Sequence, residues 1–138
     1  ERLRGYTTAL KNAGIPFDAQ LVVSGDYQVD SGLKATDQLL ASRRKFTALF
    51  TANDQMAYGA ALSLHRKGLK IPGDVSLIGF DDLYHSIYAA PPLSTIHQPA
   101  YELGRLTASS ILQMLAGTKP TAVMPAPELI VRESTSKP

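Results

Sequence analysis

The stretch Asp74–Asp82, with the sequence DVSLIGFDD, decides the fold: an apolar run ends abruptly at a glycine, an aromatic residue and two carboxylates. Such a run predicts a buried strand over residues 75–80, of the kind found in parallel sheets. Open α/β sheets bind ligands beyond the carboxyl ends of their strands. We therefore expect Asp81 to lie at a ligand site. A turn or capping role for the pair Asp81 and Asp82 is the alternative.

An acid–base role for these two carboxylates is disfavoured, because adjacent residues of an extended chain point to opposite sides. A second apolar and polar run, PPLSTIHQP at residues 91–99, then presents Gln98. It predicts a further extended segment over 94–98.

The remaining pattern alternates helices with strands. Apolar spacings of three and four predict helices over 3–13, 29–40, 53–67 and 99–115, the second capped by Asp30 or Ser31 and the third by Asn53. Short apolar runs predict strands over 21–23, 47–51 and 128–132. This order predicts an α/β fold, a mostly parallel sheet with helices on both faces.

Composition narrows the function. The 138 residues carry a formal net charge of +2, with 44% hydrophobic and 19% charged residues, as in an ordinary globular domain. The densest basic cluster, residues 43–45, follows a helical pattern and is better explained as a solvated helix end than as a nucleic-acid patch. The sequence contains no cysteine and shows no apolar run of membrane-spanning length. We expect no membrane partner.

Enzyme chemistry has no positive signal. The sequence shows no nucleophile elbow, phosphate-binding loop or dinucleotide fingerprint. The three histidines, at positions 65, 85 and 97, lack metal-ligand spacing. We expect no catalytic residue, no metal and no cofactor.

Two further polar positions have competing explanations. Asn53 precedes a predicted helix, where it can serve as the N-cap, and its amide is equally able to bind a ligand. Tyr27 follows a turn, where it can cover the end of the core or stack on a sugar or a base.

Six segments, taken together and in order, resemble the effector-binding domain of the LacI/GalR family of bacterial transcription regulators. They are RLRGY at 2–6, SGDY at 24–27, TANDQMAYGA at 51–60, the stretch 74–82, PLSTIHQP at 92–99 and LIVREST at 129–135. The resemblance implies a partial periplasmic-binding-protein-like fold of type I, of which this chain is the C-terminal part.

The same resemblance implies an effector site formed by Arg2, Tyr27, Asn53, Asp81 and Gln98. These residue types suit a small neutral polar ligand such as a sugar, because forked donors and carboxylates pair with vicinal hydroxyls while an aromatic face covers the apolar side. It also implies a homodimer surface that includes Tyr58, Leu62, His85 and Tyr88.

The family has two lobes with the effector between them. We expect residues 1–98 and 126–135 to form most of the C-terminal lobe, and residues 99–117 to form a helix of the N-terminal lobe. The function implied is that of a cytoplasmic repressor that binds a sugar-like effector, and binds operator DNA only through an N-terminal region outside these residues. A periplasmic-type sugar-binding protein of a transporter is the alternative.

The helix over 99–115 carries a stripe of apolar residues along one face. Without the rest of its lobe, this helix is expected to pack against another copy of the chain instead of projecting into solvent.

Overall fold

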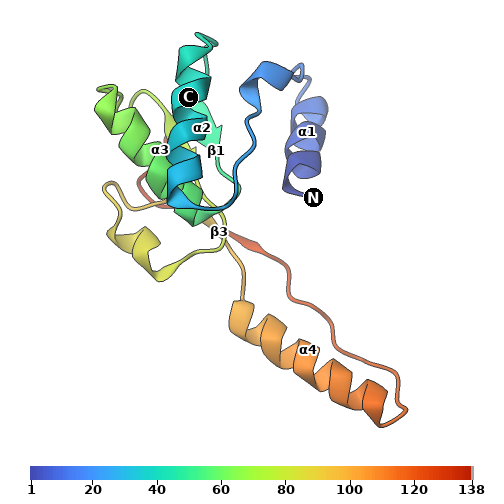
Figure 1. Cartoon of the computed structure of the whole chain (residues 1–138). Coiled ribbons are helices and arrows are strands. Elements are labelled where there is room, and N and C mark those ends of the chain that lie inside the picture. Colours follow the sequence, from blue (N-terminus) through green and yellow to red (C-terminus); the bar gives the residue numbers. More distant parts are fainter. Residues whose placement is uncertain (138) are drawn as a thin grey trace.

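The computed structural model describes residues 1–137, in which helices alternate with short strands (Figure 1). All four predicted helices are present, and the four predicted extended segments that form strands are each shorter than predicted. The elements in chain order are α1 (Arg2–Asn12), η1 (Ala19–Leu21), α2 (Val29–Ala41), β1 (Ala48–Phe50), α3 (Asp54–Arg66), β2 (Ser76–Ile78), η2 (Tyr84–Tyr88), β3 (Thr95–His97), α4 (Ala100–Leu115) and β4 (Glu128–Ile130).

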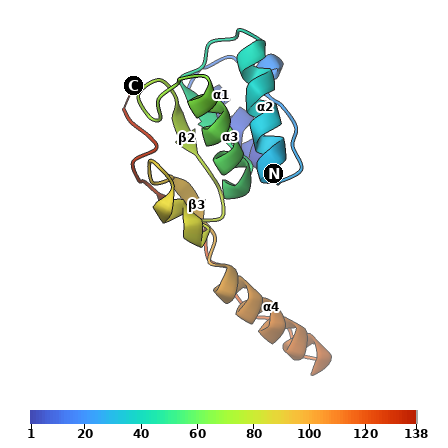
Figure 2. The same cartoon turned by 60° about the vertical axis from the view of Figure 1, so that its left-hand side comes forward.

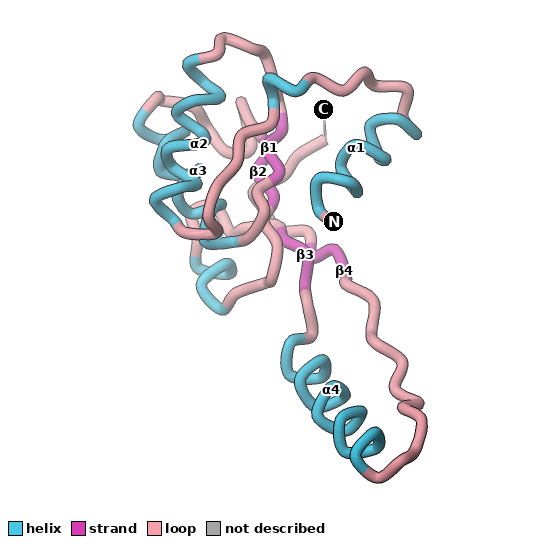
Figure 3. Tube along the Cα trace, turned by 45° about the vertical axis from the view of Figure 1, so that its right-hand side comes forward, coloured by secondary structure: helices cyan, strands magenta, loops and turns pink. Residues whose placement is uncertain are grey.

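The strands form two ladders that meet at the end of β2. β1 runs parallel to β2, with Ala48 opposite Ser76, and β3 runs antiparallel to β4. Single parallel bridges join Ile78 to Ser94 and Asp81 to His97. α2 and α3 lie on one side of β1 and β2, and α1 lies on the other (Figure 3). The predicted α/β fold with helices on both faces is therefore confirmed.

α2 and α3 pack against each other at glycines. A Cβ atom at Gly59 would overlap the carbonyl of Val29, and one at Gly32 would overlap the backbone of Met56. The two helix backbones thus touch directly. Beneath them lies a small core, formed by Ala57, Ala60, Leu77 and Leu93.

The prediction of a cap for α2 at Asp30 or Ser31 is wrong. The helix begins at Val29 with Gln28 as its N-cap residue, and no side chain caps it. Ser31 instead donates from Oγ to the Gln28 carbonyl and accepts a hydrogen bond from the Asp26 N–H. The Ser31 hydroxyl therefore bonds to the loop that precedes α2, and this contact replaces a capping interaction with the helix.

The predicted strand over 21–23 is also absent. Leu21 ends η1, and Val22 is extended but pairs with no strand. A cavity of about 710 Å³ separates this segment from β1. β1 bonds to β2 through the Thr47 carbonyl and the Thr51 N–H, so by alternation the backbone of Ala48 and Phe50 faces the opposite edge. Because a strand must pair with a neighbouring strand, and the cavity keeps residues 21–23 from pairing with β1, the predicted strand does not form.

α4 projects away from the rest of the molecule (Figures 1 and 2). β3 directly precedes α4, and after α4 the chain runs back to β4. We call the residues between these two strands, 98–127, the α4 arm. No α4 residue is buried, and Tyr101 and Leu115 are 82% and 80% exposed. The helix does not fold back onto its own chain. Among residues 1–137, no helix combines the length and apolar character that a membrane span requires.

Candidate functional site

Asp81 lies just beyond the carboxyl end of β2, as the sequence predicts. Its Oδ1 atom accepts a hydrogen bond of 2.9 Å from Nε2 of Gln98 and lies 3.6 Å from a guanidinium nitrogen of Arg2. The side chains of Arg2 and Asp81 are 32% and 30% exposed. A carboxylate, an amide and a guanidinium therefore meet at one half-buried place.

An aromatic ring that the sequence pattern did not single out positions Arg2. The guanidinium carbon lies 4.0 Å from the centroid of the Phe80 ring and 5.9 Å from that of Tyr27. Within the described chain, Nε of Arg2 is buried and has no hydrogen-bond partner. Arg2 is thus held by aromatic faces and keeps donor capacity for an added acceptor. Phe80 had a usable signal, since it directly precedes Asp81 at the end of an apolar run.

Asn53 and Tyr27 are joined to each other. Asn53 is the N-cap of α3: its Oδ1 accepts from the Met56 N–H at 2.9 Å, and its Nδ2 donates to the Tyr27 carbonyl at 3.0 Å. Asn53 is only 8% exposed, whereas Tyr27 is 53% exposed. The capping prediction for Asn53 is confirmed, and its effector contact stays a prediction.

The five predicted effector residues differ in whether they line the cavity. Arg2, Tyr27 and Gln98 line the cavity described above, whose wall also includes Phe80. Asp81 reaches this group through Arg2 and Gln98, and Asn53 reaches it only through the backbone of Tyr27. The site therefore combines forked donors, a carboxylate acceptor and aromatic faces, a set that suits a polar ligand with apolar ring faces.

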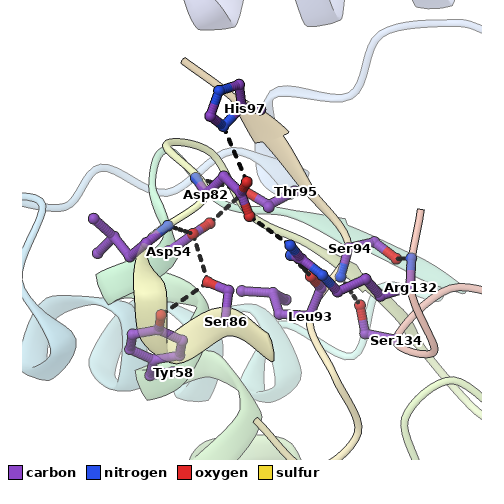
Figure 4. A network of polar contacts seen from close by, with 11 residues as sticks. Asp54, Tyr58, Asp82, Ser86, Leu93, Ser94, Thr95, His97, Arg132 and Ser134 are labelled. Carbon is purple, nitrogen blue, oxygen red and sulfur yellow. Dashed lines mark hydrogen bonds and ion pairs between the residues drawn. The ribbon is translucent and has the colours of Figure 1, made fainter. Parts of the chain in front are cut away.

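Asp82 points away from Asp81, as expected for adjacent residues. The backbone there is not extended, however, because Asp81 and Asp82 have φ angles of 111° and 56°. Asp82 accepts from Nη2 of Arg132 at 2.7 Å, and its other oxygen lies 3.0 Å from Nδ1 of His97 (Figure 4). The structure describes no group of three or more potential metal ligands in residues 1–137.

A third carboxylate, that of Asp54, is fully buried near Asp82. It accepts hydrogen bonds from the Leu83 N–H at 2.8 Å and from the hydroxyls of Ser86 and Thr95, each at 2.6 Å (Figure 4). Three donors from the segment 83–95 thus converge on the first residue of α3. Sequence reasoning placed Asp54 only next to a helix cap, because its partners lie 29 to 41 positions away.

Three of the four predicted dimer residues are exposed. Leu62 is 40% and Tyr88 65% exposed, and the Tyr88 hydroxyl lies 3.1 Å from that of Tyr84. His85 is exposed as well, with its ring edge-to-face against Tyr84. Tyr58 differs, because its hydroxyl bonds Ser86 at 2.9 Å and its ring packs against the core. Partial burial raises the pKa of Tyr58.

Comparison with known proteins identifies the domain. Residues 1–135 match the family of periplasmic binding protein-like domains. The chain is 42% identical over 137 residues to the HTH-type transcriptional repressor CytR of Escherichia coli K12, covering 97% of this chain and 40% of that protein. It is 37% identical over 139 residues to the probable HTH-type transcriptional repressor ExuR of Bacillus subtilis, covering 99% and 42%. The chain thus spans less than half the length of these relatives.

Solved structures agree with this assignment. A sugar-binding transcriptional regulator of the LacI family from Escherichia coli, complexed with phosphate, superimposes with a TM-score of 0.92 at 36% identity, covering 99% of this chain and 50% of that one. The transcriptional regulator CelR in complex with cellobiose gives 0.91 at 37% identity, covering 97% and 42%. These matches confirm the predicted fold and favour the regulator over the transport protein. The chain belongs to the periplasmic binding protein-like domain family, as part of the effector-binding domain of a LacI-family regulator.

Proposed function

We propose that this chain is the effector-binding and dimerisation part of a transcriptional repressor that responds to a small sugar or a related polar metabolite. The observation that carries the proposal is the cluster at the end of β2, where Asp81 meets Gln98 at 2.9 Å and Arg2 at 3.6 Å. Vicinal hydroxyls can both donate to such a carboxylate and accept from such a guanidinium. One structural relative, CelR, is in complex with cellobiose.

The partners follow from the same proposal. Operator DNA contacts belong to the part of the regulator outside these 138 residues, since the formal net charge here is only +2 and no basic stripe is present in the sequence. The surface around Leu62 and Tyr88 forms a homodimer contact. A regulator of this kind acts in the cytoplasm, where DNA is accessible. The relatives are transcriptional repressors, and we assign no catalytic reaction.

The domain boundaries are part of the proposal. Residues 1–98 and 126–135 form most of one lobe, and residues 99–117 contribute a helix to a second lobe. This division is supported by the projection of α4 and by the return of the chain through β4 beside β3. Because half of the effector cleft lies outside this chain, the 138 residues alone are expected to bind sugars weakly or not at all.

Mass spectrometry of ligand retained by the full-length repressor tests the function. The protein is purified gently, denatured, and the released small molecules are identified. We expect a sugar or related polar compound that is absent from the Asp81→Asn variant and present in Asp18→Asn. Asp18 is the matched control because its carboxylate pairs with Arg44, at 3.6 Å, away from the cluster. Equal retention by all three proteins contradicts the proposal.

A further inference from the structure

The carboxylate of Asp82 joins two segments that are far apart in the sequence. Its Oδ1 atom accepts from Arg132 at 2.7 Å, and its Oδ2 atom lies 3.0 Å from Nδ1 of His97 (Figure 4). The side chains of Asp82 and Arg132 are only 18% and 17% exposed. Charged hydrogen bonds shielded in this way are stronger and more directional than surface pairs.

Both partners stand at the base of the α4 arm. His97 is the last residue of β3, which leads into the arm, and Arg132 follows β4, by which the chain returns. Arg132 is itself fixed, because Nη1 donates to the Leu93 carbonyl at 2.8 Å and its N–H donates to Oγ of Ser94 at 2.9 Å. A single carboxylate of the loop after β2 thus holds the incoming and the outgoing segment of the arm.

Asp82 also shares a constrained turn with Asp81. Positive φ angles are unfavourable for residues other than glycine and persist only where the surroundings hold them. Here the Asp81 N–H donates to the Ile96 carbonyl at 2.9 Å, so the turn is tied to β3 as well. Asp81 faces Arg2 and Gln98 while Asp82 faces the arm. Because the two residues are adjacent in this turn, a change in the backbone angles of one shifts the position of the other.

We infer that Asp82 is a positioning residue that fixes the direction of the α4 arm relative to the candidate effector cluster and links that direction to the state of Asp81. The link to Asp81 rests on the proposed function, whereas the hold on the arm does not. The alternative is that Asp82 forms an ordinary ion pair that adds stability and leaves the arm's direction to β3 and β4 alone.

Pulsed electron paramagnetic resonance distinguishes these two roles without any ligand. The sequence has no cysteine, so spin labels can be placed at Arg66→Cys on α3 and Ser109→Cys on α4, both at exposed positions. The labelled chain is diluted in unlabelled chain, so that only distances within one molecule are recorded. Asp82→Asn is expected to widen the distance distribution at least twofold relative to the parent chain.

Asp37→Asn is the matched control. The Asp37 carboxylate accepts a hydrogen bond of 2.7 Å from Ser63 and joins α2 to α3, far from the arm in sequence and contact. It is expected to lower the melting temperature while leaving the distance distribution unchanged. If Asp82→Asn fails to fold, His97→Ala replaces it, because His97 is 41% exposed and its loss removes only one of the two contacts. Partial widening is expected there.

Amide hydrogen exchange then reports on the turn. In His97→Ala, exchange of the Asp81 N–H is expected to rise about tenfold while amides within α3 keep their rates. A distribution as narrow as that of the parent chain in both Asp82→Asn and His97→Ala overturns the inference. So does an Asp37→Asn variant that widens it equally. Neither result bears on whether the full-length protein retains a sugar, so the two proposals fail separately.

Discussion

Asn53 donates a hydrogen bond of 3.0 Å from its side chain to the backbone carbonyl of Tyr27, while the same side chain caps α3. The start of a core helix is therefore connected to the loop that carries an exposed aromatic residue of the candidate site. The Asn53 side chain thus caps the helix and also holds the Tyr27 loop, while contact of Asn53 with an effector stays a prediction.

Substitution can separate these two roles. Asn53→Ser keeps an oxygen that can cap α3 but removes the donor to Tyr27, so we expect stability to change little and the Tyr27 loop to loosen. Asn53→Ala removes both interactions and is expected to cost about 1–2 kcal/mol in the free energy of unfolding. Urea denaturation measures the stability. Hydrogen exchange at residues 26–28 measures the loop, and unchanged exchange in Asn53→Ser contradicts the second role.

The contact between α2 and α3 predicts opposite effects for the same substitution at two helical glycines. Gly59→Ala forces a methyl group into the Val29 carbonyl and is expected to destabilise by about 2–3 kcal/mol or more. Gly104→Ala in α4 meets nothing within 4 Å, and is expected to stabilise its helix by about 0.5–1 kcal/mol. Thermal unfolding of both variants tests the helix contact, and equal effects contradict it.

The buried carboxylate of Asp54 predicts a large loss on a nearly isosteric change. Asp54 accepts three hydrogen bonds, whereas an asparagine side chain at this position would turn an NH₂ group toward at least one of the same donors. Asp54→Asn is expected to cost about 1.5–3 kcal/mol, because at least one buried hydrogen bond to a charged acceptor is lost. Chemical denaturation measures the loss, with Asp18→Asn as the control at a half-buried carboxylate outside this network. One ordinary hydrogen bond contributes about 1 kcal/mol net to the free energy of unfolding. A smaller loss in Asp54→Asn shows that stability does not depend on a carboxylate at this position.

Local patterns and long-range contacts differ in how far the sequence could predict them. The elements α3, β2 and β3 follow from local signals, such as the cap at Asn53 and the apolar run before Asp81, whereas the short helix η2 between β2 and β3 was not predicted. The strand over 21–23 was predicted on the same kind of signal and is absent, because pairing depends on a neighbour that local sequence does not specify. The partner of Asp82, Arg132, lies 50 positions away, and no pattern in a single sequence connects them.

The exposed surface near η2 predicts how the chain dimerises. Tyr58 is a poor probe because it bonds Ser86 and packs on the core, so the test uses Leu62→Asp together with Tyr88→Asp. Two charges in an apolar contact are expected to raise the dissociation constant of the dimer at least tenfold. Sedimentation detects this change as a shift toward the monomer. Ile15→Asp, at an apolar residue that is 53% exposed and outside both proposed contacts between copies, is the control. An unchanged oligomeric state removes this surface from consideration.

The apolar face of α4 predicts a second contact between copies of this 138-residue chain. Ile111, Leu112 and Leu115 are 53%, 66% and 80% exposed, and burial of each such side chain is worth roughly 1.5–3 kcal/mol. Copies are therefore expected to pair along α4 as parallel helices, the arrangement in which like positions at the helix end lie close together. Since the sequence has no cysteine, Leu115→Cys should form disulfide-linked dimers under mild oxidation, whereas Lys119→Cys, just beyond the helix, should form few. Equal cross-linking at both positions, or none at Leu115→Cys, indicates that α4 remains unpaired in water and contradicts the prediction.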